Sequence, residues 1–402
     1  MTSYSTTKRA CYLSYFISAI INNFAPLLFF TFSRQFSLSI LQLGFIITLN
    51  FFTQIITDYL GSLYAAKVGY RTAIITAHVF AFTGLMSLGT LPYLIEPYTG
   101  IIISVILYAV GSGIIEVMVS PMIEALPENG KKASMSFLHS FFCWGQVGVV
   151  LISTLYFRIF STENWRYLSY IYAVLPVISI LMFIKAPICR IDDEESGFNI
   201  KKIFKDKFIY YFLIIMLCSG ASELAVSQWA SYFAQSGLKV SKTVGDLLGP
   251  CLFALLMGAA RVLYGLYSEK IKIKTALAIS AALCAISYMI ISLSPNPIVS
   301  LLGCGLCGFS VGVMWPGTLS FSAHKIKNVN TAMFGMLALS GDIGCTLGPT
   351  LISMISSNFT LNGDPIKAGI LFSAVFPLII LISVFALKSK KSKADTRIIK
   401  DI

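Results

Sequence analysis

Apolar runs of about twenty residues recur along the whole chain, and they constrain its fold more than any other feature. A helix needs about this length to cross roughly 30 Å of hydrocarbon, because it rises about 1.5 Å per residue. We therefore predict an all-α membrane protein with twelve transmembrane helices. The expected spans are residues 10–32, 40–63, 73–95, 100–125, 134–157, 166–185, 209–235, 244–267, 275–293, 297–322, 330–356 and 367–387.

The composition excludes a soluble domain. Of the 402 residues, 56% are hydrophobic and 12% are charged, and the mean hydropathy is +0.79, whereas soluble domains are about one-quarter charged. The net charge of +12 does not indicate nucleic-acid binding, because the basic residues flank apolar spans instead of forming one patch. The nine cysteines lie almost all inside spans, which indicates packing residues and not disulfides or metal ligands.

The basic residues gather on one side of the expected spans, the side of the two termini. Basic loops stay on the cytoplasmic side of a membrane. We therefore predict a multi-pass protein of the cell membrane, a monomer in the lipid bilayer, with both termini in the cytoplasm. The groups that decide the orientation are Lys8 with Arg9, Lys67 with Arg71, Lys131 with Lys132, the lysines from Lys201 to Lys207, those from Lys270 to Lys274, Lys325 with Lys327, and the tail from Lys388.

A charged linker divides the spans into two sets of six, and the two sets are related in sequence. We expect an N-terminal six-helix bundle over residues 1–186, a cytoplasmic linker over 187–208, a C-terminal six-helix bundle over 209–388 and a basic cytoplasmic tail over 389–402. Parallel repeats of this kind predict a carrier with its site between the halves, near the bilayer midplane. The matched positions include Tyr64 and Tyr267, Lys67 and Lys270, Arg71 and Lys274, Gly113 and Gly308, Pro121 and Pro316, and Gly145 and Gly344.

The segments after the second and eighth spans resemble the loop signature of the major facilitator superfamily. The second copy contains Glu269 and Lys270, whereas the first has Ala66 at its acidic position. The resemblance implies a gating contact between charges, which we assign to Glu269 and Lys270. Asp58, at the position that matches Arg261 in the repeat, is expected to substitute in the first half, and Arg261 is expected to serve the gate as well.

Within that superfamily, the segment from Gly111 to Pro121 and the one from Leu138 to Gly145 are similar to spans four and five of the fucose:proton symporter family. Asn22 with Asn23, and Glu223 with Trp229, also resemble that family. The resemblance implies proton-coupled sugar uptake. Fucose permeases place an aspartate where this chain has Pro26, so the substrate and the coupling do not follow from the resemblance alone.

Glu116 is the candidate for proton coupling. It lies about ten residues from the expected end of its span and therefore about 15 Å deep, where an ionised acid costs several kcal/mol. Ser112 and Ser120 share its helix face, which Pro121 is placed to bend toward a cavity. The alternative is an acid that is permanently neutral or paired with a neighbouring helix.

Polar and aromatic residues inside the spans are the candidates for solute binding. Asn50, Gln54 and Asp58 recur every four residues and form a polar stripe along one helix. Amides and carboxylates can take the hydroxyls of a sugar while an indole stacks on its ring, although each residue alone could equally be a contact between helices. The expected binding residues are Asn22, Asn23, Asn50, Gln54, His139, Gln146, Glu223, Gln228, Trp229 and Trp315, with Asp342 as a further cavity acid.

The sequence thus predicts a proton-coupled importer of a monosaccharide or similar small polar solute, working by alternating access. Export of amphipathic drugs or metabolites is the alternative on the same fold, and it requires a mainly apolar cavity. We expect no enzyme activity, no cofactor and no metal, because three isolated histidines supply neither a catalytic group nor a ligand cluster.

Overall fold

The computed structural model is a bundle of membrane-spanning helices, described for residues 4–126, 131–189, 204, 206–267, 271–326 and 331–387. The side chains of residues 62–67, 131–137, 139–140 and 331–332 fall outside the description. Twelve helical segments are long and apolar enough to cross a membrane, and the described residues form no strand, only an isolated bridge between Leu361 and Asp364. The predicted all-α fold with twelve spans is confirmed.

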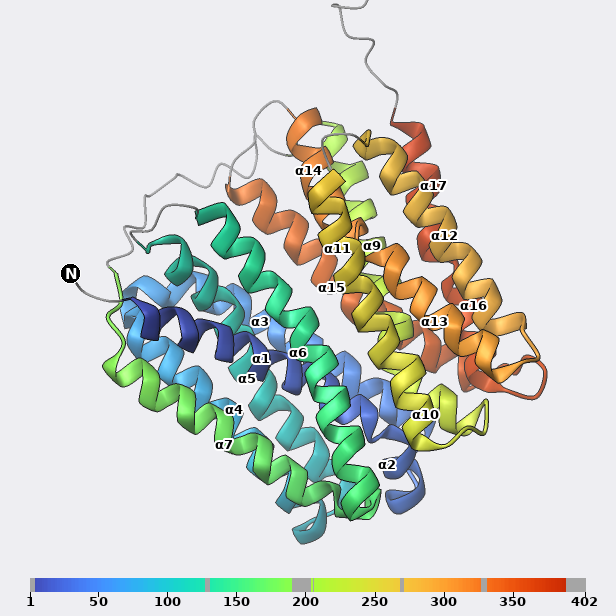
Figure 1. Cartoon of the computed structure of the whole chain (residues 1–402), viewed down its shortest axis with the longest axis horizontal. Coiled ribbons are helices and arrows are strands. Elements are labelled where there is room, and N and C mark those ends of the chain that lie inside the picture. Colours follow the sequence, from blue (N-terminus) through green and yellow to red (C-terminus); the bar gives the residue numbers. More distant parts are fainter. Residues whose placement is uncertain are drawn as a thin grey trace, which may run out of the picture.

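The chain forms two groups of six spans, which lie side by side in Figure 1. The first group consists of α1 (Ser5–Leu27) with α2 (Phe29–Phe36), α3 (Ile40–Val68), α4 (Tyr70–Leu94), α5 (Pro97–Glu124), α6 (Lys131–Phe160), and η1 (Thr162–Asn164) with α7 (Trp165–Lys185). The second consists of α9 (Phe208–Ser236), α10 (Lys242–Asp246) with η2 (Leu247–Cys251) and α11 (Leu252–Tyr267), α12 (Ile273–Leu293), α13 (Pro297–Val311) with α14 (Met314–Lys325), α15 (Thr331–Ser356), and α16 (Pro365–Ser373) with α17 (Val375–Ala386). The predicted domain boundaries themselves stay a prediction.

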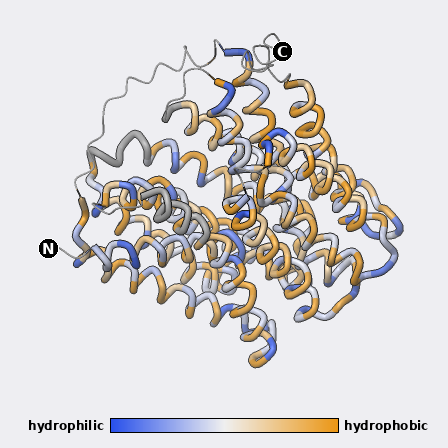
Figure 2. Tube along the Cα trace, turned by 45° about the horizontal axis from the view of Figure 1, so that its top comes forward, coloured by the Kyte–Doolittle hydropathy of each residue, from blue (hydrophilic) through white to orange (hydrophobic). Residues whose placement is uncertain are grey.

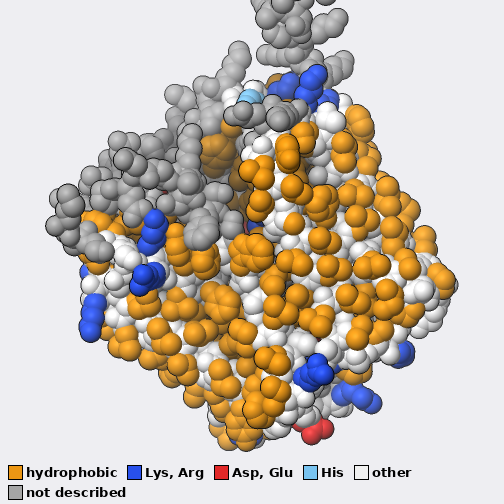
Figure 3. Space-filling view, viewed as in Figure 1, with side chains coloured by type: hydrophobic (Ala, Val, Ile, Leu, Met, Phe, Trp, Pro, Cys, Tyr) orange, Lys and Arg blue, Asp and Glu red, His pale blue; other side chains and the backbone are white. Residues whose placement is uncertain are grey.

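The outer surface is suited to lipid. In Figure 3 hydrophobic side chains cover the middle of the visible face, while Lys and Arg lie near its edges. Figure 2 shows hydrophilic segments chiefly at the helix ends. We call the membrane face on which α1 begins and α17 ends the terminus side, and the other face the opposite side.

On the opposite side, three spans begin with the same local device. Glu96, Asn296 and Asp364 each cap a helix by accepting backbone N–H groups, and each is followed by a proline at the first helical position. Proline fits there because the first N–H of a helix has no partner within it. The hydrogen bonds from Thr99 and Tyr98 lower the pKa of Glu96.

Two spans that face the other half are interrupted. The first span breaks at Leu28, directly after Pro26 and Leu27, so that α2 starts anew at Phe29. The eighth contains the π-helical turn η2, which includes Pro250. Proline removes a backbone donor and disturbs the preceding turn of a helix, which accounts for both breaks.

The two groups touch on the opposite side through α3 and α15. The hydroxyls of Thr48 and Thr350 lie 2.6 Å apart. A Cβ atom on Gly44 would collide with Ser353, so glycine is needed for this close approach. These residues belong to the part of α3 near its start and the part of α15 near its end, and the halves are therefore closed against each other on the opposite side.

Candidate functional site between the two halves

Four buried amides form a cluster where the halves meet, and we call Asn22, Asn50, Gln54 and Gln228 the amide cluster. Asn50 Nδ2 and Gln54 Nε2 donate to Asn22 Oδ1 at 3.0 and 2.7 Å. Gln228 Nε2, from α9 of the other half, donates to the backbone oxygen of Asn22 at 3.2 Å. The side chains that were predicted separately on three helices are thus brought together.

One acceptor of the amide cluster is free to take a ligand. The Oδ1 atom of Asn50 is buried and has no hydrogen-bond partner among the described residues. Leaving such an atom unsatisfied costs about 1–3 kcal/mol. A hydroxyl or N–H of a bound solute would remove that cost.

Two more predicted amides lie in the first half. Asn23 Nδ2 donates to Ala19 O of its own helix at 2.9 Å, so this donor is already used. Gln146 of α6 is only 3% exposed, and the described residues offer its side chain no hydrogen bond. Its neighbour Gly145 packs on α1, where an added Cβ would lie 2.8 Å from Ala19.

Glu116 is exposed even though it lies within a packed span. On one side of its position, Ser112 bonds to Ser18 of α1 at 2.7 Å. On the other side, Gly113 abuts Thr57 of α3. Glu116 follows these two residues by four and three positions and therefore lies on the same face of α5. Its exposure is to space inside the protein and not to lipid.

Two further acids share that space, and we call Asp58, Glu116 and Asp342 the cavity acids. Asp58 on α3 and Asp342 on α15 are half-buried. Glu116 interacts electrostatically with both, and Asp58 and Asp342 also interact with each other. The described residues form no ion pair with any of the three, and Asp58 Oδ1 is buried without a hydrogen-bond partner among them.

Arg261 of α11 contacts residues of both halves. Its Nη2 atom lies 3.5 Å from Glu223 Oε2, and its Nη1 atom lies 3.1 Å from Cys143 Sγ of α6 in the first half. Glu223, predicted as a solute ligand, is therefore the partner of the predicted gate residue. Cys143 was missed, although the repeat that matches Gly145 with Gly344 also places Cys143 opposite Asp342.

The two tryptophans that were predicted to bind solute, Trp229 and Trp315, differ in how accessible their rings are. Trp229 is fully buried, donates to Pro349 O at 3.1 Å, and packs against Phe29 and Tyr232. Its ring has no free face for a solute in this conformation. Trp315 is half-buried and lies against Gly341 of α15, directly beside Asp342.

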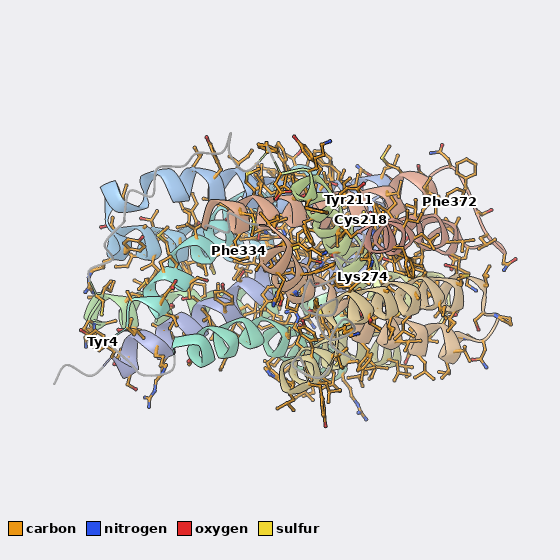
Figure 4. The ribbon with its side chains drawn as sticks, turned by 90° about the horizontal axis from the view of Figure 1, so that it is seen from above. Tyr4, Tyr211, Cys218, Lys274, Phe334 and Phe372 are labelled. Carbon is orange, nitrogen blue, oxygen red and sulfur yellow. The ribbon has the colours of Figure 1, made fainter. Side chains whose placement is uncertain are left out.

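The side chain of His139 and the pair Glu269 and Lys270 lie outside the described residues, so the gate assigned to that pair stays a prediction. Among the residues that are described, no three His, Cys, Asp or Glu side chains are grouped to hold a metal ion. Figure 4, seen from above relative to Figure 1, shows the bundle in which these helices run, with Tyr4 of the first half and Phe372 of the second at opposite ends.

Two parallel six-helix halves around a polar centre define the class of multi-pass membrane proteins that move solutes between their halves. The sequence profile described as Major Facilitator Superfamily matches residues 11–349, and the chain belongs to this family. The family and the fold point to a transporter and not to an enzyme.

Among solved structures, the chain is similar to a D-xylose-proton symporter, with a TM-score of 0.79, 15% identity, and coverage of 95% of this chain and 97% of that one. It is similar to the nucleoside transporter NupG, with a TM-score of 0.74, 14% identity, and coverage of 97% and 100%. It is also similar to the E. coli fucose:proton symporter FucP, with a TM-score of 0.63, 16% identity, and coverage of 96% and 100%. The membrane protein MosC of Rhizobium meliloti is 24% identical over 284 residues, which are 70% of this chain and 67% of MosC.

Proposed function

We propose that this protein imports a monosaccharide or a similar small polar solute together with a proton, by alternating access between its two halves. The protein would act as a monomer in the cell membrane, with both termini in the cytoplasm. The observation that carries the proposal is that two packed spans hold two polar groups. The amide cluster with its free acceptor includes Asn50 and Gln54 of α3, and the exposed carboxyl group of Glu116 lies on α5, which packs on α3 at Gly113.

The amide cluster supports a polyhydroxylated solute. Amides both donate and accept hydrogen bonds, as a sugar hydroxyl does. The hydrogen bond from Gln228 to Asn22 crosses between the halves. A solute bound there would contact both halves, and its contacts would change when the halves move. A polar centre of this kind disfavours the export of amphipathic drugs, because that function calls for a mainly apolar cavity.

Glu116 supports coupling to protons. An acid held inside a membrane span favours its neutral form, and the exposure of Glu116 gives water and solute access to it. Two similar structures are named as proton symporters of D-xylose and fucose, which agrees with this assignment for a related fold. The nucleoside transporter NupG makes nucleosides a second class of solute to test.

The test is uptake of labelled pentoses, hexoses, deoxyhexoses and nucleosides by proteoliposomes under an imposed pH gradient. We expect accumulation of one of them, and we expect Glu116→Gln to abolish accumulation while solute exchange without a gradient continues. Glu124→Gln is the matched control, because Glu124 is an exposed acid at the end of the same helix. Accumulation by Glu116→Gln at the level of the unmodified protein would contradict the assignment.

A second variant tests the solute site separately. Asn50→Leu removes the free acceptor and should raise the KM for the transported solute by roughly tenfold, as expected for one lost hydrogen bond. It should leave the dependence on the pH gradient intact. An unchanged KM would remove Asn50 from the binding site.

A further inference from the structure

Lys242, on the opposite side, joins the two halves through a set of contacts that the proposed function does not use. It is the first residue of α10 in the second half, and its side chain is 13% exposed. Its Nζ atom lies 2.6 Å from Leu27 O of the first half. The same atom lies 2.7 Å from Asp246 Oδ2 and 3.2 Å from Ser231 Oγ of its own half.

The first half presents two groups that suit an ammonium ion. Leu27 is the last residue of α1, where the first span breaks, and the carbonyl end of a helix carries partial negative charge. The ring of Phe157, from α6, lies 5.4 Å from Lys242 Nζ, which is within the range of a cation–π interaction. One lysine thus contacts both α1 and α6 of the other half.

The second half holds this lysine in place independently of the first. Asp246 is completely buried, and its Oδ1 accepts a hydrogen bond from Ser231 Oγ at 2.5 Å. Because Lys242 and Asp246 are four residues apart in one helical segment, they stay paired when the halves move apart. Only the contacts with Leu27 and Phe157 would break, and no buried charge would lose its partner.

We propose that Lys242 is the latch of the opposite side, which holds the halves together there by binding the end of α1 and the ring of Phe157, and which must release for that side to open. Because breaking this contact leaves no buried charge without a partner, the contact can form and break once in every transport cycle. The inference rests on the alternating access of the proposed function but not on the identity of the solute or of the coupling ion.

The test is a distance measurement between spin labels on the opposite side. Labels at Glu163→Cys and Thr360→Cys report on the two halves, since Glu163 is exposed in the short helix η1 and Thr360 is exposed in a loop, both on the opposite side. Cys189→Ser provides the background, because the other eight cysteines are buried. The purified full chain in nanodiscs, without solute or gradient, is measured with and without Lys242→Met.

We expect Lys242→Met to populate longer distances, with the ratio of open to closed molecules raised by about tenfold or more, as for a lost hydrogen bond to a charged group. Lys239→Met is the matched control, because Lys239 is an exposed lysine on the same side and should leave the distances unchanged. Phe157→Leu removes the ring alone, and it should shift the distances in the same direction by less.

An unchanged distance distribution in Lys242→Met, in protein that elutes and unfolds like the unmodified chain, would overturn the latch. If that variant does not fold, Phe157→Leu provides the test. A shift toward longer distances in Phe157→Leu supports the latch, and the absence of a shift overturns it. Because no transport is measured, failure to find sugar uptake would not affect the result.

Discussion

Two helix pairs join the halves around the candidate site, and the repeat in the sequence relates them. In the pair of α6 and α11, Arg261 contacts Cys143 across the halves at 3.1 Å. In the pair of α3 and α15, the matching positions hold Asp58 and Asp342, two acids that interact electrostatically and have no ion-pair partner among the described residues. The repeat thus has polar groups at equivalent positions in both pairs. The groups of the α6 and α11 pair attract each other, whereas the two acids of the α3 and α15 pair repel each other when both are ionised.

This difference suggests different roles for the two pairs. The contact of Arg261 is the same at any pH at which proteins work, since a guanidinium does not lose its proton. Two carboxyl groups can approach closely only when at least one of them is protonated. Because α3 and α15 already touch on the opposite side through Thr48 and Thr350, closing the terminus side would bring Asp58 and Asp342 together. We therefore expect the α3 and α15 pair to respond to protons and the other pair to serve as a fixed contact.

The largest effect is expected from Arg261→Met. It leaves Glu223, whose side chain is 12% exposed, without its partner, and we expect a loss of about 2 kcal/mol in the free energy of unfolding together with loss of transport. Thermal unfolding in detergent measures the first. The double variant with Glu223→Gln should regain much of the stability, because no charge is then left unpaired. Equal melting temperatures for Arg261→Met and the unmodified chain would show that the pair contributes nothing.

The helices, and the polar face of α3 that carries two members of the amide cluster, could be predicted from the sequence for physical reasons. Twenty-residue apolar runs leave little choice but spanning helices, and the four-residue spacing of Asn50 and Gln54 places both on one face of α3. That face could be expected to meet other polar side chains in a bundle with little water. Asn22, from another helix, proved to be the acceptor for both.

The charged partners were not predictable in the same way. Arg261 and Glu223 lie on different helices, so no spacing within the sequence indicates that they pair. Lys242 and Asp246 are four residues apart and readable as a pair on one helical turn, but their contact with Leu27 depends on how the halves close. Cys143 is one of several cysteines inside the apolar spans, and only its position in the repeat distinguishes it.

Asp342→Arg gives the α3 and α15 pair one charge of each sign. Asp58 should then attract position 342, which favours closure of the terminus side and slows transport by roughly tenfold or more, as for a newly formed partly buried ion pair. The measurement is uptake, combined with distances between spin labels on the terminus side. Asp342→Asn is the control, since it removes the negative charge without supplying a positive one. If Asp342→Arg transports as fast as Asp342→Asn, the terminus side does not close through this pair.

A smaller effect is expected on the pH dependence of transport. Raising the pH ionises both Asp58 and Asp342 and opposes closure of the terminus side, so the rate of transport should fall as pH rises. Asp58→Asn leaves a single acid in this pair, with Glu116 beside it, and should flatten the fall on the alkaline side. Exchange rates measured at several equal internal and external pH values report this directly. A pH profile identical to that of the unmodified chain would place the titrating group elsewhere.

The smallest effect is expected from Cys143→Ser, because a thiol is a weak hydrogen-bonding group and Arg261 keeps Glu223 as its partner. We expect the free energy of unfolding to change by less than about 1 kcal/mol and transport to continue. Cys143→Asp is the informative counterpart, since it places on α6 the acid that the repeat has on α15 at Asp342. Arg261 would then bind a carboxylate of the other half, and the opening of that pair should slow. Cys143→Ser could instead abolish transport, as Arg261→Met is expected to do. The contact between Arg261 and Cys143 would then matter more for transport than the pairing of Arg261 with Glu223. In that case the pair of α6 and α11 is a moving gate and not a fixed contact.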